Sequence, residues 1–265
     1  MPGADPYGNT FPKLLQLNNG TTWMIWQKNV QYGQVWMMAQ NGFGWGGQIP
    51  LLSNNTWDDI APSIAQLNNG TVILTWSRGS PGSISTYNLY MESYSNSRWS
   101  GPIPLVTTAA PNFDPVLAKL YNGSVMMVWS RAVGTGGNGE LYYRLLSNGV
   151  WMGEHPIPNA STGTYDDKLP SIVQAFDGRI WIVFESNRSG TPQIWYTTLS
   201  GMTWSLPNAL TNTTEADEWP TIGQDRNGSL WIFWTREVPN GTQNGQTVYQ
   251  RDVYSRFSIS NGASW

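Results

Sequence analysis

Apolar runs recur along the chain in five sets, and every set begins with the same arrangement of residues. A proline is followed by seven residues, a glycine, five residues and an aromatic residue. The glycine belongs to an Asn-Gly or Asp-Gly dipeptide that separates two apolar-rich runs. Such dipeptides are strong hairpin signals, because both central residues of a type I′ turn need a positive φ. Each set therefore predicts two strands joined by a type I′ turn.

The anchor positions define a repeat of roughly fifty residues. The prolines are Pro12, Pro62, Pro115, Pro170 and Pro220, the glycines are Gly20, Gly70, Gly123, Gly178 and Gly228, and the aromatic residues are Trp26, Trp76, Trp129, Phe184 and Trp234. Successive glycines are 50, 53, 55 and 50 residues apart. A further Trp ends a third apolar segment in each repeat, and a fourth segment follows it in the first four.

The second strand of each repeat is apolar at successive positions, as in residues 180–184 and 230–234. A strand that is apolar on both faces is covered on both faces. Repeated four-stranded units of this length predict an all-β, five-bladed β-propeller with antiparallel blades. We expect one domain over residues 1–265, with repeats at about 6–56, 57–108, 109–162, 163–213 and 214–265. Residues 1–5 are predicted to add the outer strand that the last repeat lacks.

The turns that end in tryptophan resemble the Asp-box of the sialidase-like (BNR-type) repeat propellers, whose pattern is Ser-x-Asp-x-Gly-x-Thr-Trp. Residues 258–265 keep Ser258, Gly262 and Trp265 of this pattern but lack the Asp, and residues 197–204 are similar. The resemblance implies a place among sialidase-like or lectin-like propellers. In that family the box is a structural turn remote from catalysis, so the resemblance carries no activity with it.

Composition and charge exclude several classes of function. The chain has 14 Lys+Arg against 17 Asp+Glu and no basic run, so we expect no nucleic acid partner. No apolar stretch is long enough to predict membrane insertion. The absence of Cys removes thiolate chemistry, and the single His removes a metal site built on two or more His.

No cofactor is predicted, with calcium as the alternative. The acid pairs Asp58-Asp59 and Asp166-Asp167 offer the oxygen ligands that calcium takes, but the chain lacks an Asp-x-Asp-x-Asp-Gly loop. With 16 Trp, 12 Tyr and only 12% charged residues, the composition favours a secreted or cell-surface protein.

Acidic and basic residues recur at two positions of the repeat. Acids stand just before the repeat proline at Asp59, Asp114, Asp167 and Asp217 or Glu218, and arginines just after the closing aromatic at Arg78, Arg131, Arg188 and Arg236. The first repeat has Asn9 and Lys28 instead. These side chains either form a polar cup at the mouth of the channel or pair with one another and hold the blades. Repetition favours pairing, because catalysis needs a unique arrangement.

Departures from the repeat are therefore the better indicators of chemistry. Glu185 replaces the serine found at Ser77 and Ser130, so a hydrolase would use Asp59, Asp167 and Glu185 as its acids. Five-bladed glycosidases of the arabinanase type place three carboxylates around the axis, one of them from the first blade. The first repeat here offers only Asn9. Sialidases use three arginines with a Tyr–Glu pair, and no motif identifies that pair in this chain.

The aromatic residues also divide into those at repeated positions and those outside the repeat pattern. The tryptophans at repeated strand positions are predicted to pack in the core. Trp57, Trp219 and Tyr165 stand near the acids outside this pattern and are predicted to line the mouth. With the four arginines and Lys28, they form the predicted ligand-binding set.

The sequence favours a non-catalytic, lectin-like recognition module outside the cell, with a glycan or glycoprotein ligand at the channel mouth. Two alternatives stay open. One is a glycoside hydrolase of sialidase-like or arabinanase-like type, and the other is a protein-binding scaffold domain of a surface protein. The sequence leaves the oligomeric state open.

Overall fold

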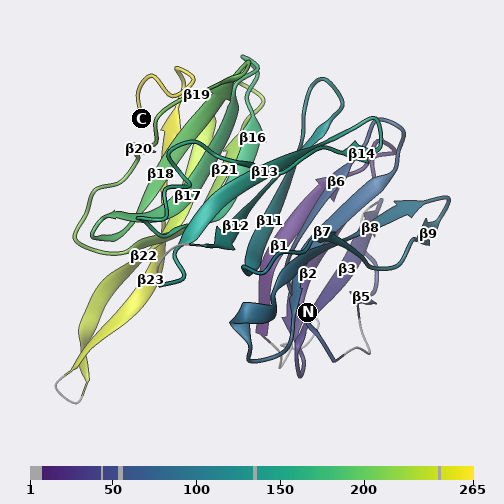
Figure 1. Ribbon diagram of the computed structural model, residues 1–265, viewed down its shortest axis with the longest axis horizontal. Helices are drawn as coiled ribbons and strands as arrows, with labels where there is room; N and C mark the ends of the chain where they lie inside the picture. The colour runs from purple at the N-terminus through teal and green to yellow at the C-terminus, as the bar shows by residue number, and fades with distance from the viewer. Residues whose placement is uncertain (1–7, 43, 53–55, 134–135, 244–245) are drawn as a thin grey trace. The chain divides into compact units, whose positions relative to one another are not determined.

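Each of the five repeats folds into one antiparallel sheet, and the five sheets follow one another along the chain (Figure 1). The computed structural model describes residues 8–42, 44–52, 56–133, 136–243 and 246–265. The fold is an all-β, five-bladed β-propeller, as predicted.

The first two blades have the same design. The first blade consists of β1 (Gly8–Gln16), β2 (Thr22–Asn29), β3 (Gly33–Asn41), β4 (Gly44–Trp45) and β5 (Ile49–Leu52). The second consists of β6 (Asp58–Gln66), β7 (Val72–Gly79), β8 (Asn88–Ser95), β9 (Arg98–Trp99) and β10 (Ile103–Val106), with a 3₁₀ turn, η1 (Ile84–Thr86), before β8. In both, the predicted fourth strand is two short strands that each pair with the third.

The next two blades repeat this order. The third blade consists of β11 (Asn112–Lys119), β12 (Val125–Ala132), β13 (Gly139–Ser147), β14 (Val150–Trp151) and β15 (His155–Pro156). The fourth consists of β16 (Asp167–Gln174), β17 (Ile180–Ser189), β18 (Thr191–Ser200), β19 (Thr203–Trp204) and β20 (Asn208–Ala209).

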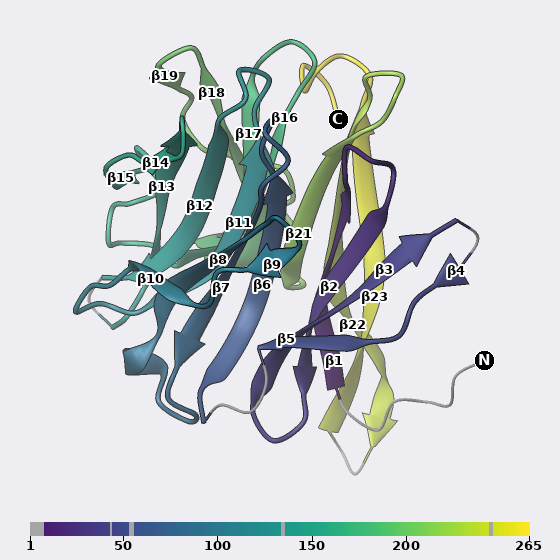
Figure 2. The same cartoon turned by 90° about the vertical axis from the view of Figure 1, so that its right-hand side faces the viewer.

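The fifth blade has three described strands, β21 (Asp217–Gln224), β22 (Leu230–Gln243) and β23 (Gln246–Ser258). The last two are long and extend as a hairpin beyond the other strands of their sheet (Figures 1 and 2). The outer strand predicted from residues 1–5 falls outside the described residues.

The hairpins between first and second strands differ from the predicted type I′ turn. In the second blade the Gly70 N–H donates to the Leu67 carbonyl (3.1 Å), and the Leu67 N–H donates to the Thr71 carbonyl (2.8 Å). Gly70 has a φ of 88°, whereas neither asparagine of the turn has a positive φ. This geometry is a type I turn followed by a glycine bulge. The Asn69 side chain stabilises it by accepting the Thr71 N–H at 3.0 Å.

A bulge also interrupts the first strand, at the residue before the repeat proline. That residue has a positive φ in all five blades: Phe11, Ala61, Asp114, Leu169 and Trp219, with φ between 50° and 53°. The register of the described first-to-second-strand pairs shifts there, for example between Glu218 and Thr221. Bulges redirect side chains and backbone groups, and non-glycine residues with this φ are strained.

The repeated tryptophans pack in the core, as predicted. Trp76 and Trp129 are fully buried, and Trp26 and Trp234 are 5% and 4% exposed. The same prediction for the tryptophans at the third turn is wrong for Trp45, which is 44% exposed. Three of the others pack on the preceding blade. Trp99 lies 6.1 Å from Trp23, Trp204 lies 5.3 Å from Tyr143, and Trp265 lies 5.6 Å from Trp181, measured between ring centroids.

The chain divides into two compact units, residues 1–127 with 145–152 and residues 128–144 with 153–265. The boundary runs through the strands of the third blade. A single domain over the whole chain stays a prediction. The described part of the chain contains no helix with the length and apolar character that a membrane span requires.

One buried acid makes the stability of the fold depend on pH. Glu92 on β8 is 4% exposed and lies opposite Leu74. Burial raises its pKa to about 7; the charge of Arg78 lowers the pKa and that of Asp59 raises it. In the unfolded chain a glutamate titrates near 4.3. Between these pH values the folded state keeps a proton that the unfolded state has lost, so stability falls as pH rises.

We expect Glu92→Gln to raise the melting temperature, with the gain growing from pH 5 to pH 8, because glutamine needs no proton to stay neutral. Calorimetry at several pH values measures the difference. A difference in melting temperature between variant and parent that stays constant from pH 5 to pH 8 would contradict the assignment.

Candidate functional site

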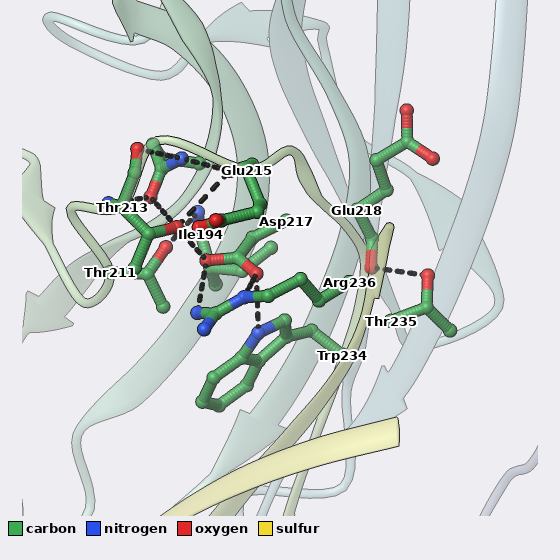
Figure 3. Close-up of polar contacts among 10 residues, drawn as sticks. Ile194, Thr211, Thr213, Glu215, Asp217, Glu218, Trp234, Thr235 and Arg236 are labelled. Atoms are coloured by element: carbon green, nitrogen blue, oxygen red, sulfur yellow. Dashed lines mark hydrogen bonds and ion pairs between the residues drawn. The ribbon is translucent and has the colours of Figure 1, made fainter. Parts of the chain in front are cut away.

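The fifth blade shows how the repeated acid and arginine are used (Figure 3). Asp217 is fully buried, and its Oδ1 accepts from the Trp234 indole N–H (2.9 Å) and the Arg236 Nε–H (2.6 Å). Its Oδ2 accepts from Arg236 Nη2 at 2.9 Å. The guanidinium lies 4.4 Å from the ring of Tyr254 on the third strand. Bonding to Asp217 raises the pKa of Arg236. We call this arrangement the acid–cation pair of a blade.

The second blade repeats this arrangement. Asp59 Oδ1 accepts from Trp76 Nε1 (2.7 Å) and Arg78 Nε (2.6 Å), and Oδ2 accepts from Arg78 Nη2 (2.9 Å). The guanidinium lies 5.0 Å from the ring of Tyr90. Asp59 is fully buried, and both of its oxygens are occupied by donors from its own blade.

The third blade departs from the sequence prediction. Asn112, three residues before the repeat proline, occupies the position of Asp59, because the bulge assigns Asp114 to the strained residue next to the proline. Arg131 pairs with Glu154 and lies 4.2 Å from the ring of Tyr142. Of the predicted acids, Asp59, Asp167 and Asp217 therefore occupy the paired position, and the prediction is wrong for Asp114.

In the first blade, Asn9 replaces the acid and Lys28 replaces the arginine. Asn9 accepts from the Trp26 indole at 3.0 Å. Lys28 is 8% exposed, and its Nζ lies 3.3 Å from Gln48 Oε1 and 4.5 Å from the Trp36 ring. The cation on an aromatic face is thus common to all five blades.

The second acids at Asp58 and Asp166 join neighbouring blades. Asp58 Oδ1 accepts from the Gly33 N–H at 2.5 Å, and Asp166 Oδ1 accepts from the Gly139 N–H at 2.8 Å. A Cβ at either glycine would come within 3.1 Å of the facing carboxylate, so only glycine fits. Among the described residues, no group of three or more His, Asp or Glu side chains is placed to hold a metal ion.

Glu185 occupies a position that links three of the blades to the next one along the chain. In the first, second and fourth blades, the residue after the closing aromatic accepts the N–H of the strained residue before the next repeat proline. The Ser130 hydroxyl of the third blade has no hydrogen-bond partner among the described residues. Gln27 accepts from Ala61 (3.2 Å), and Ser77 accepts from Asp114 (3.1 Å). Glu185 accepts from the backbone of Trp219 in the same way. The fourth blade therefore puts a carboxyl group where the other blades have neutral side chains.

Glu185 is 3% exposed and only partly compensated. Its Oε1 lies 3.4 Å from Lys168 Nζ, which is closer to Asp166 Oδ2 at 2.8 Å. Its Oε2 has no hydrogen-bond partner within the described chain. Burial raises the pKa of Glu185 to about 7; Lys168 and the Trp219 backbone lower the pKa, and the charge of Glu218 raises it. Glu185 can therefore hold and release a proton near neutral pH.

A second carboxyl group and an aromatic surface lie beside Glu185 on the fifth blade. The Glu218 side chain, 23% exposed, points away from Asp217 (Figure 3) and pairs with Arg251 Nη2 at 3.2 Å. Arg251 also pairs with Glu237 at 2.8 Å and lies 4.3 Å from the ring of Trp219. Trp219 is 44% exposed, so this edge presents two carboxyl groups and an open indole.

The structure distributes the predicted site residues between the two units. Arg78, Lys28 and Trp57 belong to the first, where Trp57 is 44% exposed. The remaining members, Arg131, Arg188, Arg236, Trp219 and Tyr165, belong to the second.

Among the predicted acids, Asp59 is enclosed by its blade and Asp167 is bonded to Arg188. Arg188 in turn lies 4.7 Å from the ring of Tyr165. Only Glu185 combines burial, a partial set of partners and a neutral-range pKa.

Sequence reasoning missed Lys168, Arg251 and the role of Glu218. Glu218 could have been noticed from its position next to Asp217, just before Trp219 and the repeat proline. Successive residues of a strand point to different sides, so Glu218 was available for another role when Asp217 was paired. Arg251 carries no repeat signal, because it reaches the site only through the long β22–β23 hairpin.

Comparison with solved structures places the fold among sugar-processing propellers. The chain superposes on an α-L-arabinanase from Penicillium chrysogenum complexed with arabinobiose, with a TM-score of 0.64, 13% identity, and coverage of 92% of this chain and 82% of that one. It superposes on an α-L-arabinofuranosidase of Fusarium graminearum complexed with arabinobiose, with a TM-score of 0.66, 12% identity, and coverage of 92% and 80%.

A protein of unknown function from Dyadobacter fermentans gives a TM-score of 0.69 at 12% identity, with coverage of 86% and 75%. Other similar structures are a xylosidase and a sialidase. No protein-family model matches the sequence, and no curated protein matches it.

These comparisons overturn the prediction of a non-catalytic, lectin-like module. The solved structures with this fold are mostly glycoside hydrolases, which favours the hydrolase alternative. The repeat symmetry that argued against catalysis belongs to the acid–cation pairs, whereas Glu185 stands outside that symmetry.

We expect Asp217→Ala to lower the free energy of unfolding by about 3–5 kcal/mol, because it leaves the buried Arg236 without its carboxylate. Asp177→Ala is the matched control. It removes an ion pair to Arg179 whose side chains are 26% and 33% exposed, so it should change stability by no more than about 1 kcal/mol. Chemical denaturation measures both. Equal losses in the two variants would show that the acid–cation pair has no special structural role.

Proposed function

We propose that the protein is a glycoside hydrolase in which Glu185 is the proton donor. The observation that carries this proposal is the environment of Glu185, a buried carboxyl with one oxygen free of partners in the described chain and a pKa of about 7. A general acid works best when its pKa lies near the operating pH. The fold shared with arabinose- and xylose-releasing enzymes supports the proposal.

Glu218 is proposed as the second carboxylate. Glycoside hydrolysis generally uses two carboxyl groups, one neutral and one ionised. Arg251 Nη2 contacts Glu218 at 3.2 Å, whereas burial raises the pKa of Glu185 to about 7. The two neighbouring acids therefore have different surroundings, with a guanidinium partner for Glu218 and a buried position for Glu185.

In the proposed reaction, Glu185 gives its proton to the glycosidic oxygen as the bond to the anomeric carbon breaks. Glu218 stabilises the positive charge that develops on the sugar, either by bonding to the anomeric carbon or by taking a proton from the attacking water. Lys168 lies 3.4 Å from Glu185 and stabilises the carboxylate left after proton transfer.

The substrate is proposed to be a neutral glycoside containing arabinose or xylose. A sialoside needs free guanidinium groups for its carboxylate, but Arg78, Arg188 and Arg236 are each bonded to an aspartate of their own blade. The exposed indole of Trp219 offers a flat surface for the C–H face of a sugar. Similar structures hold arabinobiose.

Two further parts of the proposal concern the setting of the protein. We propose that it acts outside the cell, where polymeric plant-type glycosides are met. We also propose that the turn at 258–265 is a degenerate Asp-box, since Ser258 Oγ accepts the Gly262 N–H at 2.8 Å and Trp265 packs on Trp181.

We expect Glu185→Gln to lower kcat by about 10²–10⁴-fold on arabinan and xylan oligosaccharides, because glutamine cannot protonate the leaving group. On dinitrophenyl glycosides, which leave without protonation, the same variant should stay within about tenfold of the parent. Glu218→Gln should fail on both substrate types. Released sugar is measured by chromatography and released nitrophenol by absorbance.

Asp177→Asn, remote from the proposed site, is the control and should behave as the parent does. Full activity of Glu185→Gln on the oligosaccharides would exclude Glu185 as the acid. A folded parent that cleaves none of these glycosides would exclude the proposed reaction.

A further inference from the structure

The acid–cation pair of the fourth blade differs from those of the second and fifth blades. In the other two, one carboxylate oxygen accepts both an indole N–H and the arginine Nε–H. In the fourth blade, Phe184 replaces the tryptophan and Ser186 stands where the arginine is expected. The arginine comes two residues later, as Arg188, and only its Nη2 reaches Asp167 Oδ2.

The altered pair lies among three polar side-chain atoms that are unsatisfied. Asp167 Oδ1, Arg188 Nε and Trp195 Nε1 are buried without a hydrogen-bond partner among the residues that the structure describes. The Asp167 side chain is 2% exposed, and the Arg188 guanidinium lies 5.6 Å from the Trp195 ring. Burial raises the pKa of Asp167, even though Ser186 and Arg188 bond to it and lower the pKa.

Buried polar atoms without partners destabilise a fold, so a cluster of them calls for an explanation. The repeat itself shows that a satisfied arrangement was accessible, because two other blades contain it. Local departures of this kind are expected where a protein binds or transforms a ligand.

The three atoms fit one chemical group. An acceptor next to two N–H donors matches a hydroxyl group, which donates one hydrogen bond and accepts others. The carboxylate disfavours an anion and the guanidinium disfavours a cation, so a neutral group is favoured. Tyr165, with its ring 4.7 Å from the Arg188 guanidinium, adds an aromatic surface of the kind that sugars contact.

We propose that Asp167, Arg188 and Trp195 form a subsite that binds a hydroxyl group of a neutral sugar. Asp167 pairs with Ser186 and Lys168 pairs with Glu185, so the subsite and the acid occupy adjacent rungs of one ladder, and their side chains point to opposite faces of the fourth blade. The subsite deepens the proposed glycoside hydrolase activity and rests on it. It assigns sugar recognition to the fourth blade.

The repeat provides the test, because the closed pair of the fifth blade can be transferred to the fourth. The triple variant Phe184→Trp, Ser186→Arg and Arg188→Ser supplies both missing donors to Asp167 Oδ1. We expect its melting temperature to rise and its affinity for arabinobiose and xylobiose, measured by calorimetry, to fall at least tenfold. Ser186→Arg with Arg188→Ser, which keeps Phe184 in the core, should show the same direction if the triple variant does not fold.

Trp76→Phe is the matched control, since it opens the equivalent pair of the second blade. It should lower the melting temperature and leave disaccharide affinity unchanged. A crystal structure of the parent with arabinobiose or xylobiose should show a sugar hydroxyl oxygen within hydrogen-bond distance of Asp167 Oδ1.

The outcomes separate the subsite from the reaction. Weaker binding in the transferred-pair variants, with a parent that binds but does not cleave, supports the subsite and overturns the hydrolase. Unchanged binding and KM in those variants, with a parent that cleaves, overturns the subsite alone. A parent that binds neither disaccharide, or a complex in which only water contacts Asp167, also overturns the subsite.

Discussion

A buried carboxylate bonded to a guanidinium that lies on an aromatic ring is the interaction on which the second, fourth and fifth blades depend. The interaction joins three strands of a blade. In the second and fifth blades the acid lies on the first strand, the arginine and the indole lie on the second, and the aromatic ring lies on the third. A buried ion pair is stable only when its hydrogen bonds are nearly complete. In the second and fifth blades they are, since both oxygens of Asp59 and of Asp217 accept donors from their own blade. This requirement keeps the arginines from serving as general anion receptors.

The proposed function uses the places where the repeat is broken. The fourth blade has a carboxyl group at the inter-blade position, Glu185, and an incomplete acid–cation pair at Asp167. Both changes leave buried polar atoms unsatisfied within the described chain, and both lie on adjacent rungs of β16 and β17. A repeated scaffold thus supplies rigidity, while one altered blade supplies the acid and a place for a hydroxyl group. This division explains why symmetry at the arginines said little about activity.

Much of the fold could be predicted from the sequence, because turn glycines, repeat prolines and closing aromatics mark every blade. Glu185 also stood out as a departure from the serine of other repeats. The turn type was predicted wrongly, since Asn-Gly fits both a type I′ turn and a type I turn with a glycine bulge. Asp114 was grouped with the paired acids because it also precedes the repeat proline, although the paired acids stand three residues before that proline and Asn112 has this place in the third repeat. The approach of Arg251 depends on hairpin length and register, which no local pattern encodes.

The central claim is that Glu185 carries a proton at neutral pH in the folded protein. Its titration can be followed directly by NMR of carboxyl-labelled glutamate, assigned by comparison with Glu185→Gln, without any substrate. The structure predicts a midpoint of about 7 for this residue, with desolvation as the main cause. A midpoint near the ordinary glutamate value of about 4.3 would contradict the account, because an acid ionised at neutral pH has no proton to give.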